Sequence, residues 1–234
     1  MFVKRMTDNE EKIFYYFTKH IKEFFDNLGH PWFVMHGTLL GAWRHKAVIP
    51  WDDDLDILYP ESKLADLFDA VKKKGWECTT FTHRKNVITH AELTLINSAD
   101  RFDLFKIYDP NLVLPYMATD WPCVDVGLYK EHGDMFGFEY AKGHRFIWGL
   151  KEHFLPVNYG TFGPLQMPLP KNAETFLNFL YPYWKTHPTS SHKSHRDNKK
   201  YDEQHEVKTI KELIKMGFSF YNVDAHHHFN LKIL

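Results

Sequence analysis

The sequence is most informative at residues 49–58, which read IPWDDDLDIL. Side chains alternate between the two faces of an extended strand, so Asp52, Asp54 and Asp56 are predicted to share one face. The apolar residues between and after them would then enter the core through the other face. Carboxylates aligned in this way repel one another, and a divalent cation bound to their oxygens removes that cost.

The acidic segment has two other interpretations. An EF-hand loop that starts at Asp52 would need Gly at its sixth position and Glu at its twelfth, where the sequence has Ile57 and Lys63. A solvated acidic loop is the commonest use of a charge run, but it would not require the apolar alternation after Asp54. We therefore predict a strand from Trp51 to Tyr59 whose aligned carboxylates hold a divalent cation such as Mg²⁺ or Mn²⁺.

A metal site on one strand needs a further carboxylate from elsewhere in the fold. Asp125 is the first candidate, because it lies inside the apolar segment 123–129, CVDVGLY, where an unpaired carboxylate would be costly. Asp103 is the second candidate, and its alternative role is an ion pair with Lys106 or Arg101.

A strand, a turn and a short helix precede the acidic segment. Residues 32–35 are predicted to form a buried strand that leads into a helix opened by Gly37 and Thr38. The free N–H groups of such a turn favour a phosphate, and Arg44 and Lys46 would neutralise a diphosphate. The alternatives are a plain turn after a strand and ordinary surface charge.

The remaining segments predict an α+β (mixed α/β) protein. The residues Thr7 and Glu10 form a capping-box pattern before a helix that ends at Gly29. Further along, the patterns predict a helix over 62–74, strands over 87–96, 102–108 and 123–129, a loop over 159–164 and a helix from Pro170. We expect a catalytic domain over 1–184, a basic polar loop or linker over 185–201, and a C-terminal helix and tail over 202–234.

Composition excludes several classes of protein. The 234 residues carry a net charge of -1, which argues against a general nucleic-acid coat. The two cysteines cannot form a disulfide scaffold or a four-ligand zinc site. We see no signal peptide and no apolar run long enough for a membrane span, so the expected location is the cytoplasm, or the lumen of the secretory pathway if the N-terminus has been trimmed.

The segment His36 to Asp56, HGTLLGAWRHKAVIPWDDDLD, closely resembles the signature of the LicD family, which includes bacterial phosphocholine transferases, fukutin and fukutin-related protein. A second landmark, FGPLQMPLP over 162–170, is similar to the closing segment of the family. The resemblance covers roughly residues 10–184. It implies a nucleotidyltransferase-like central sheet flanked by helices, with metal and nucleotide held at positions that match Gly37, Thr38, Asp54, Asp56 and Asp125.

The resemblance also implies an activity. Family members move a phosphorylated alcohol, such as phosphocholine or ribitol phosphate, from a CDP-linked donor to a sugar hydroxyl of a glycan or glycoconjugate. For this chain Asp52 is the predicted base that takes the acceptor proton. Two alternatives remain at this point: a nucleotidyltransferase that makes an NDP-alcohol from an NTP, and a non-catalytic nucleotide-binding module.

Overall fold

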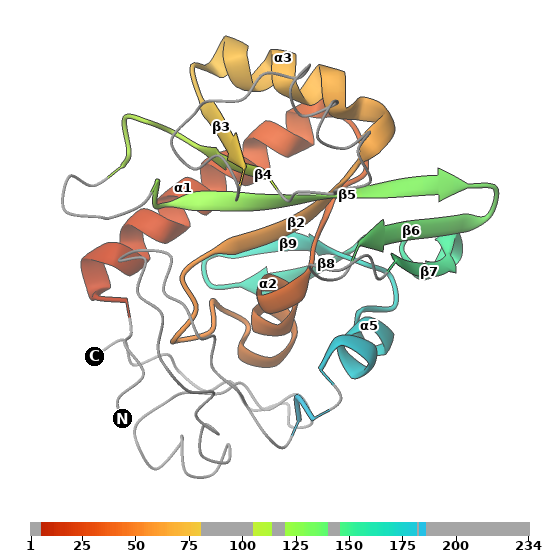
Figure 1. The fold of residues 1–234 in the computed structure, drawn as a ribbon. Helices are drawn as coiled ribbons and strands as arrows, with labels where there is room; N and C mark the ends of the chain where they lie inside the picture. Colours follow the sequence, from red (N-terminus) through yellow and green to blue (C-terminus); the bar gives the residue numbers. More distant parts are fainter. Residues whose placement is uncertain (1–5, 81–104, 114–119, 140–145, 182, 186–234) are drawn as a thin grey trace.

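The computed structural model describes residues 6–80, 105–113, 120–139, 146–181 and 183–185 (Figure 1). The predicted strand over 87–96, the candidate ligand Asp103 and almost all of the predicted linker and C-terminal helix lie outside the described residues. The division into 1–184, 185–201 and 202–234 therefore stays a prediction.

Among the residues described, seven strands form a central sheet with both parallel and antiparallel neighbours. The two central strands, β2 and β5, run parallel, whereas every other pair in the sheet is antiparallel. This mixed sheet with its helices confirms the predicted α+β class. The path is β1 (Phe33–Val34), β2 (Leu55–Pro60), β5 (Cys123–His132), β4 (Phe105–Tyr108) and β3 (Glu77–Thr80), with β6 (Met135–Glu139) and β7 (Phe146–Leu150) added beside β5.

The helix α1 (Asp8–Leu28) begins and ends as its sequence predicts. Thr7 accepts a hydrogen bond from the backbone of Glu10, whose side chain in turn accepts one from the backbone of Thr7. Gly29 ends the helix in the left-handed conformation, with φ of 71°. The buried side chains of α1 include Phe14, Phe17, Ile21 and Phe25.

The helices α1 and α3 (Leu64–Lys74) cover one face of the sheet (Figure 1). Phe25 of α1 contacts Tyr59 of β2, with ring centroids 5.4 Å apart, and Phe68 of α3 contacts Phe105 of β4 at 5.5 Å. The contact of Phe25 with Tyr59 helps to bury the apolar side of β2, as the alternation predicted. A short 3₁₀ turn, Glu61–Lys63, joins β2 to α3.

The strand β2 is shorter than expected. It starts at Leu55 rather than at Trp51, because residues 50–51 lie in a turn in which the Asp52 N–H donates to the Ile49 carbonyl at 2.8 Å. Of the acids, only Asp56 lies within the strand itself, and Asp54 immediately precedes it.

The opposite side of β2 faces a short helix, α2 (His36–Leu40), which continues as a π-helical turn over Gly41–His45. Beyond the sheet, a two-stranded hairpin pairs β8 (Asn158–Phe162) with β9 (Leu165–Leu169). The prediction of a loop over 159–164 was therefore wrong: its glycines suggested a loop, but Gly163 makes the tight turn, with φ of 58°, and Phe162 is buried.

After the hairpin, the last described helix, α5 (Ala173–Leu180), begins slightly later than Pro170. Another 3₁₀ turn, Lys151–His153, follows β7. In the part of the chain that the structure describes, we find no helix whose length and apolar character would let it cross a bilayer.

Candidate metal and catalytic site

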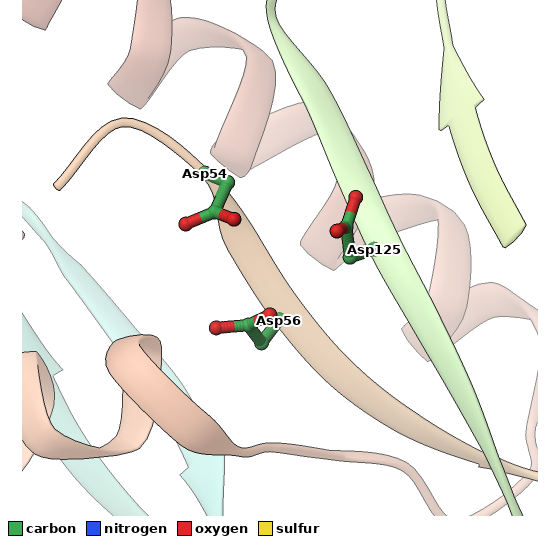
Figure 2. A group of neighbouring side chains, drawn as sticks. All are labelled: Asp54, Asp56 and Asp125. Atoms are coloured by element: carbon green, nitrogen blue, oxygen red, sulfur yellow. The ribbon is translucent and has the colours of Figure 1, made fainter. Parts of the chain in front are cut away.

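Three of the predicted carboxylates meet at the start of the two central strands. Figure 2 shows Asp54 and Asp56 on the β2 segment and Asp125 on the adjacent β5. One oxygen from each of these side chains lies within 4.8 Å of the other two. The parallel register brings this about, because it places Asp56 directly beside Asp125.

The next strand, β4, places a cationic side chain beside Asp125. Lys106 is paired in register with Asp125, and its Nζ forms an ion pair with Asp125 Oδ1. The same Nζ lies 3.6 Å from Cys123 Sγ. Asp56, Asp125 and Lys106 thus stand side by side on three neighbouring strands.

The surroundings keep Lys106 charged. Burial by itself would lower the pKa of Lys106, which is only 8% exposed, but the attraction of Asp125, and after it of Cys123 and Asp54, outweighs burial and raises that pKa. The sequence had offered Lys106 only as a partner for Asp103. No local pattern indicates that it pairs with Asp125, since the register of β4 against β5 decides this.

The helix α2 is tied to β2 through the candidate ligand Asp56. The Gly37 N–H donates to Asp56 Oδ2 at 3.1 Å, and the Asp56 N–H donates to Thr38 Oγ1 at 2.8 Å. The Met35 N–H donates to the Asp56 carbonyl at 3.1 Å. Gly37 and Thr38 therefore fix the position of a carboxylate, and their contact with a donor phosphate stays a prediction.

The acids raise one another's pKa. Desolvation raises the pKa of Asp52 well above its usual value, and repulsion by Asp54 and then Asp56 raises it further. Desolvation, with repulsion by Asp54 and Asp125, likewise raises the pKa of Asp56, although Lys106 opposes this. Asp52 and Asp56 therefore hold a proton more readily than an isolated carboxylate would.

These residues suit a hard divalent cation. All three candidate ligands are carboxylates, which Mg²⁺ and Mn²⁺ prefer to nitrogen or sulfur. Ligands about 2.1 Å from one Mg²⁺ lie at most roughly 4 Å apart. The carboxylate oxygens lie within 4.8 Å of one another, so small side-chain movements would bring them to that separation. The mutual repulsion of the acids also favours the binding of a cation among them. The identity of the metal rests on this chemistry alone.

A comparison with protein families agrees with the geometry. The family described as LicD/FKTN/FKRP, nucleotidyltransferase domain, matches residues 29–172, more than half of the 234 residues. The chain belongs to the LicD family. Membership implies transferase activity of the phosphocholine or phosphoryl-alcohol type in general, which confirms the resemblance and, at this level, the predicted class of activity. Among curated proteins no match was found.

The LicD match is narrower than the resemblance over 10–184, but it contains every candidate site residue. It spans the junction of α2 with β2 and the three carboxylates. It also includes Lys106. The first and the last described helices, α1 and α5, lie outside it, although both pack on the same core.

The two predicted phosphate-binding cations lie in the turn after α2. Arg44 is 4% exposed, and its Nη1 donates to the Trp184 carbonyl at 2.8 Å. Burial lowers the pKa of Arg44 to about 10, which still leaves the guanidinium charged near neutrality. Lys46 is half-buried, with its Nζ 5.4 Å from the centroid of the Trp43 ring. Binding of a diphosphate by Arg44 and Lys46 stays a prediction.

One residue that holds the acidic segment in place, Trp121, was not predicted from the sequence. Trp121 is fully buried, and its Nε1 donates to the backbone carbonyl of Asp53 at 2.6 Å. The bond fixes the chain between Asp52 and Asp54, just before β2 starts. A tryptophan shortly before a strand that carries a candidate ligand is too common a pattern to predict such a contact.

Proposed function

We propose that the protein is a metal-dependent phosphotransferase that moves a phosphorylated alcohol from a CDP-linked donor to a sugar hydroxyl of a glycan or glycoconjugate. The observation that supports it most is the meeting of Asp54, Asp56 and Asp125 within 4.8 Å, in a chain of the LicD family. In this proposal the three carboxylates hold Mg²⁺ or Mn²⁺. When bound, such an ion stabilises negative charge on the donor diphosphate.

The reaction exchanges one phosphorus–oxygen bond for another. The acceptor hydroxyl oxygen forms a bond to the phosphorus that carries the alcohol, and the bond from that phosphorus to the oxygen of the leaving CMP breaks. The hydroxyl proton must go to a base. Asp52 is the proposed base: burial, with repulsion by Asp54 and Asp56, raises its pKa, and this increases its affinity for the proton that it must take.

The other predicted residues have supporting parts. Gly37 and Thr38 hold Asp56 in position through the bonds described above. Arg44 and Lys46 supply positive charge on the turn that follows, and in this proposal they offset the charge of the departing nucleotide. The near-zero net charge of the chain agrees with a small-molecule donor and a sugar acceptor rather than nucleic acid.

The decisive experiment measures transfer with a panel of donors. Purified protein is incubated with CDP-choline or CDP-ribitol, a sugar acceptor and Mg²⁺ or Mn²⁺, and the release of CMP is followed. Asp54→Asn is expected to lower the rate at least about a hundredfold, because a metal ligand and its charge are lost. Asp69→Asn on α3, which removes an exposed acid outside the cluster, serves as the matched control with an unchanged rate.

The same panel separates the alternatives. A nucleotidyltransferase would release pyrophosphate from CTP and an alcohol phosphate, and would leave the CDP-alcohols intact. A binding module would bind nucleotide without turnover of any donor. Full activity of Asp54→Asn with a CDP-alcohol would refute the proposed role of the metal site.

A further inference from the structure

Lys106 lies beside the acidic site, and the proposed reaction assigns it no role. Its side chain reaches Asp125 from the neighbouring strand β4 and is 8% exposed. Asp125 itself is 4% exposed. A buried carboxylate accepts several hydrogen bonds, so the ion pair at Oδ1 still leaves Asp125 acceptor capacity for a metal.

The negative charge of the site favours a cationic side chain beside it. Asp52, Asp54, Asp56 and Asp125 together carry up to four negative charges, and the last three have oxygens within 4.8 Å of one another. Burying such charges without a partner would strongly oppose folding. An ammonium group on the same row of the sheet offsets part of this repulsion before any metal arrives.

We propose that Lys106 is the resident counter-ion of the acidic site, a positioning residue that balances and orients Asp125 when no metal is bound and opposes the charge of the metal when it binds. The inference rests on the proposed function in one respect, since it takes Asp54, Asp56 and Asp125 to be the metal ligands. It makes Lys106 set the metal affinity without itself being a ligand.

The proposal predicts two effects of opposite sign. Removing the ammonium takes a cation away from the buried Asp125, so the metal-free protein should lose stability. It also removes a positive charge that repels the incoming cation, so the metal should bind more tightly. A lysine that only holds the strands together would show the first effect without the second.

The test compares Mn²⁺ binding, followed by electron paramagnetic resonance, with thermal unfolding. In Lys106→Met, which keeps the length of the side chain but not its charge, we expect a Kd for Mn²⁺ about tenfold lower than that of the wild type. We expect its melting temperature to be about 10 °C lower without metal, and most of this loss to be recovered with saturating Mn²⁺.

The control removes a surface ion pair of similar chemistry. Lys151 pairs with Glu131 at 2.5 Å, and both side chains are about 40% exposed. Lys151→Met should therefore change the Kd for Mn²⁺ by less than about twofold and the melting temperature by no more than about 2 °C.

A double variant keeps the proposal testable if Lys106→Met does not fold without metal. Lys106→Met with Asp125→Asn leaves neither charge unpaired, so it should fold without metal and melt within about 5 °C of the wild type. A double variant that melts no higher than Lys106→Met would overturn the proposal, and so would an unchanged or raised Kd in Lys106→Met.

The outcomes also separate this inference from the proposed function. Asp54→Asn is included in the binding series, and it should bind Mn²⁺ at least about tenfold more weakly than the wild type. If the wild type binds Mn²⁺ no better than Asp54→Asn, the metal site fails and both proposals fall. If that comparison succeeds and Lys106→Met does not bind more tightly, the counter-ion role of Lys106 alone is overturned.

Discussion

The close approach of Gly37 to the acids makes Gly37→Ala an informative perturbation. A Cβ at this position would collide with Asp52 Oδ2 and would lie 3.5 Å from Asp56 Oδ2. The backbone at Gly37 is helical, so alanine is otherwise acceptable there and favours the helix by about 0.5–1 kcal/mol. The variant therefore tests the contact rather than the conformation of the backbone.

The size of the effect follows from what can move. Overpacking of a well-filled site costs about 1–3 kcal/mol, and the gain in helix propensity offsets part of it, so we expect a net loss of about 1 kcal/mol in the free energy of unfolding. The atom that must yield is the end of the Asp52 side chain, not the backbone. The carboxylate is therefore displaced from its place beside Asp56. A misplacement near 1 Å in a catalytic group lowers rates by up to about a hundredfold, which is the loss of transfer activity we expect.

Urea unfolding and CMP release measure the two consequences, and a double variant shows whether the contact is their cause. Combining Gly37→Ala with Asp52→Ala keeps the new Cβ but removes the carboxylate oxygen that it would meet, so the stability effects should be non-additive by about 1 kcal/mol or more. Gly41→Ala is the control: its Cβ would lie 2.7 Å from the Ala47 carbonyl, so it should cost stability through the backbone without coupling to Asp52. Additive effects of Gly37→Ala and Asp52→Ala would refute the reasoning.

Two further predictions concern residues around the acids. Arg44→Lys should lower the free energy of unfolding by about 2 kcal/mol, because lysine cannot reproduce the buried hydrogen bond to the Trp184 carbonyl, and a loss below about 0.5 kcal/mol in chemical denaturation would contradict this. Burial lowers the pKa of His36 to about 4, against a smaller opposing effect of Asp54, so the folded protein resists protonation of this ring. Neutral His36 therefore contributes stability above pH 6.5 that is lost as the pH falls towards 4. His36→Asn, which tolerates the positive φ of 48°, should remove up to about 3 kcal/mol of this loss, and equal pH profiles of unfolding for the two proteins would contradict it.

Local patterns in the sequence were sufficient for much of the fold and for proposing two of the three candidate metal ligands. The capping box of α1 and its glycine end involve residues a few positions apart, so they are visible without knowledge of the tertiary structure. The same holds for Asp54 and Asp56, whose spacing alone places them near each other. The start of β2 was predicted too early because the turn before Asp52 depends on a backbone hydrogen bond from Asp52 to Ile49. The side chains in this segment do not indicate that bond.

The contacts that complete the site come from pairings distant in sequence. Asp56 lies beside Asp125 because β2 and β5 are parallel, and the Trp121 indole reaches the Asp53 carbonyl across 68 positions. The expectation that a buried Asp125 needs a partner was sound, but the partner could not be chosen. Nothing in the sequence indicates which residue of a neighbouring strand stands opposite it.

The ion pair between Lys106 and Asp125 helps to select the register that produces it. A slip of one residue between β4 and β5 would place Phe105 or Ile107 opposite Asp125 and turn the lysine to the other face of the sheet. That face is packed by α1 and α3, where a buried ammonium would be unpaired, and the carboxylate would lose its cation as well. Each of these defects costs several kcal/mol, whereas the correct register removes both at once. The ion pair proposed to balance Asp125 in the metal-free site therefore also favours the alignment of β4 against β5.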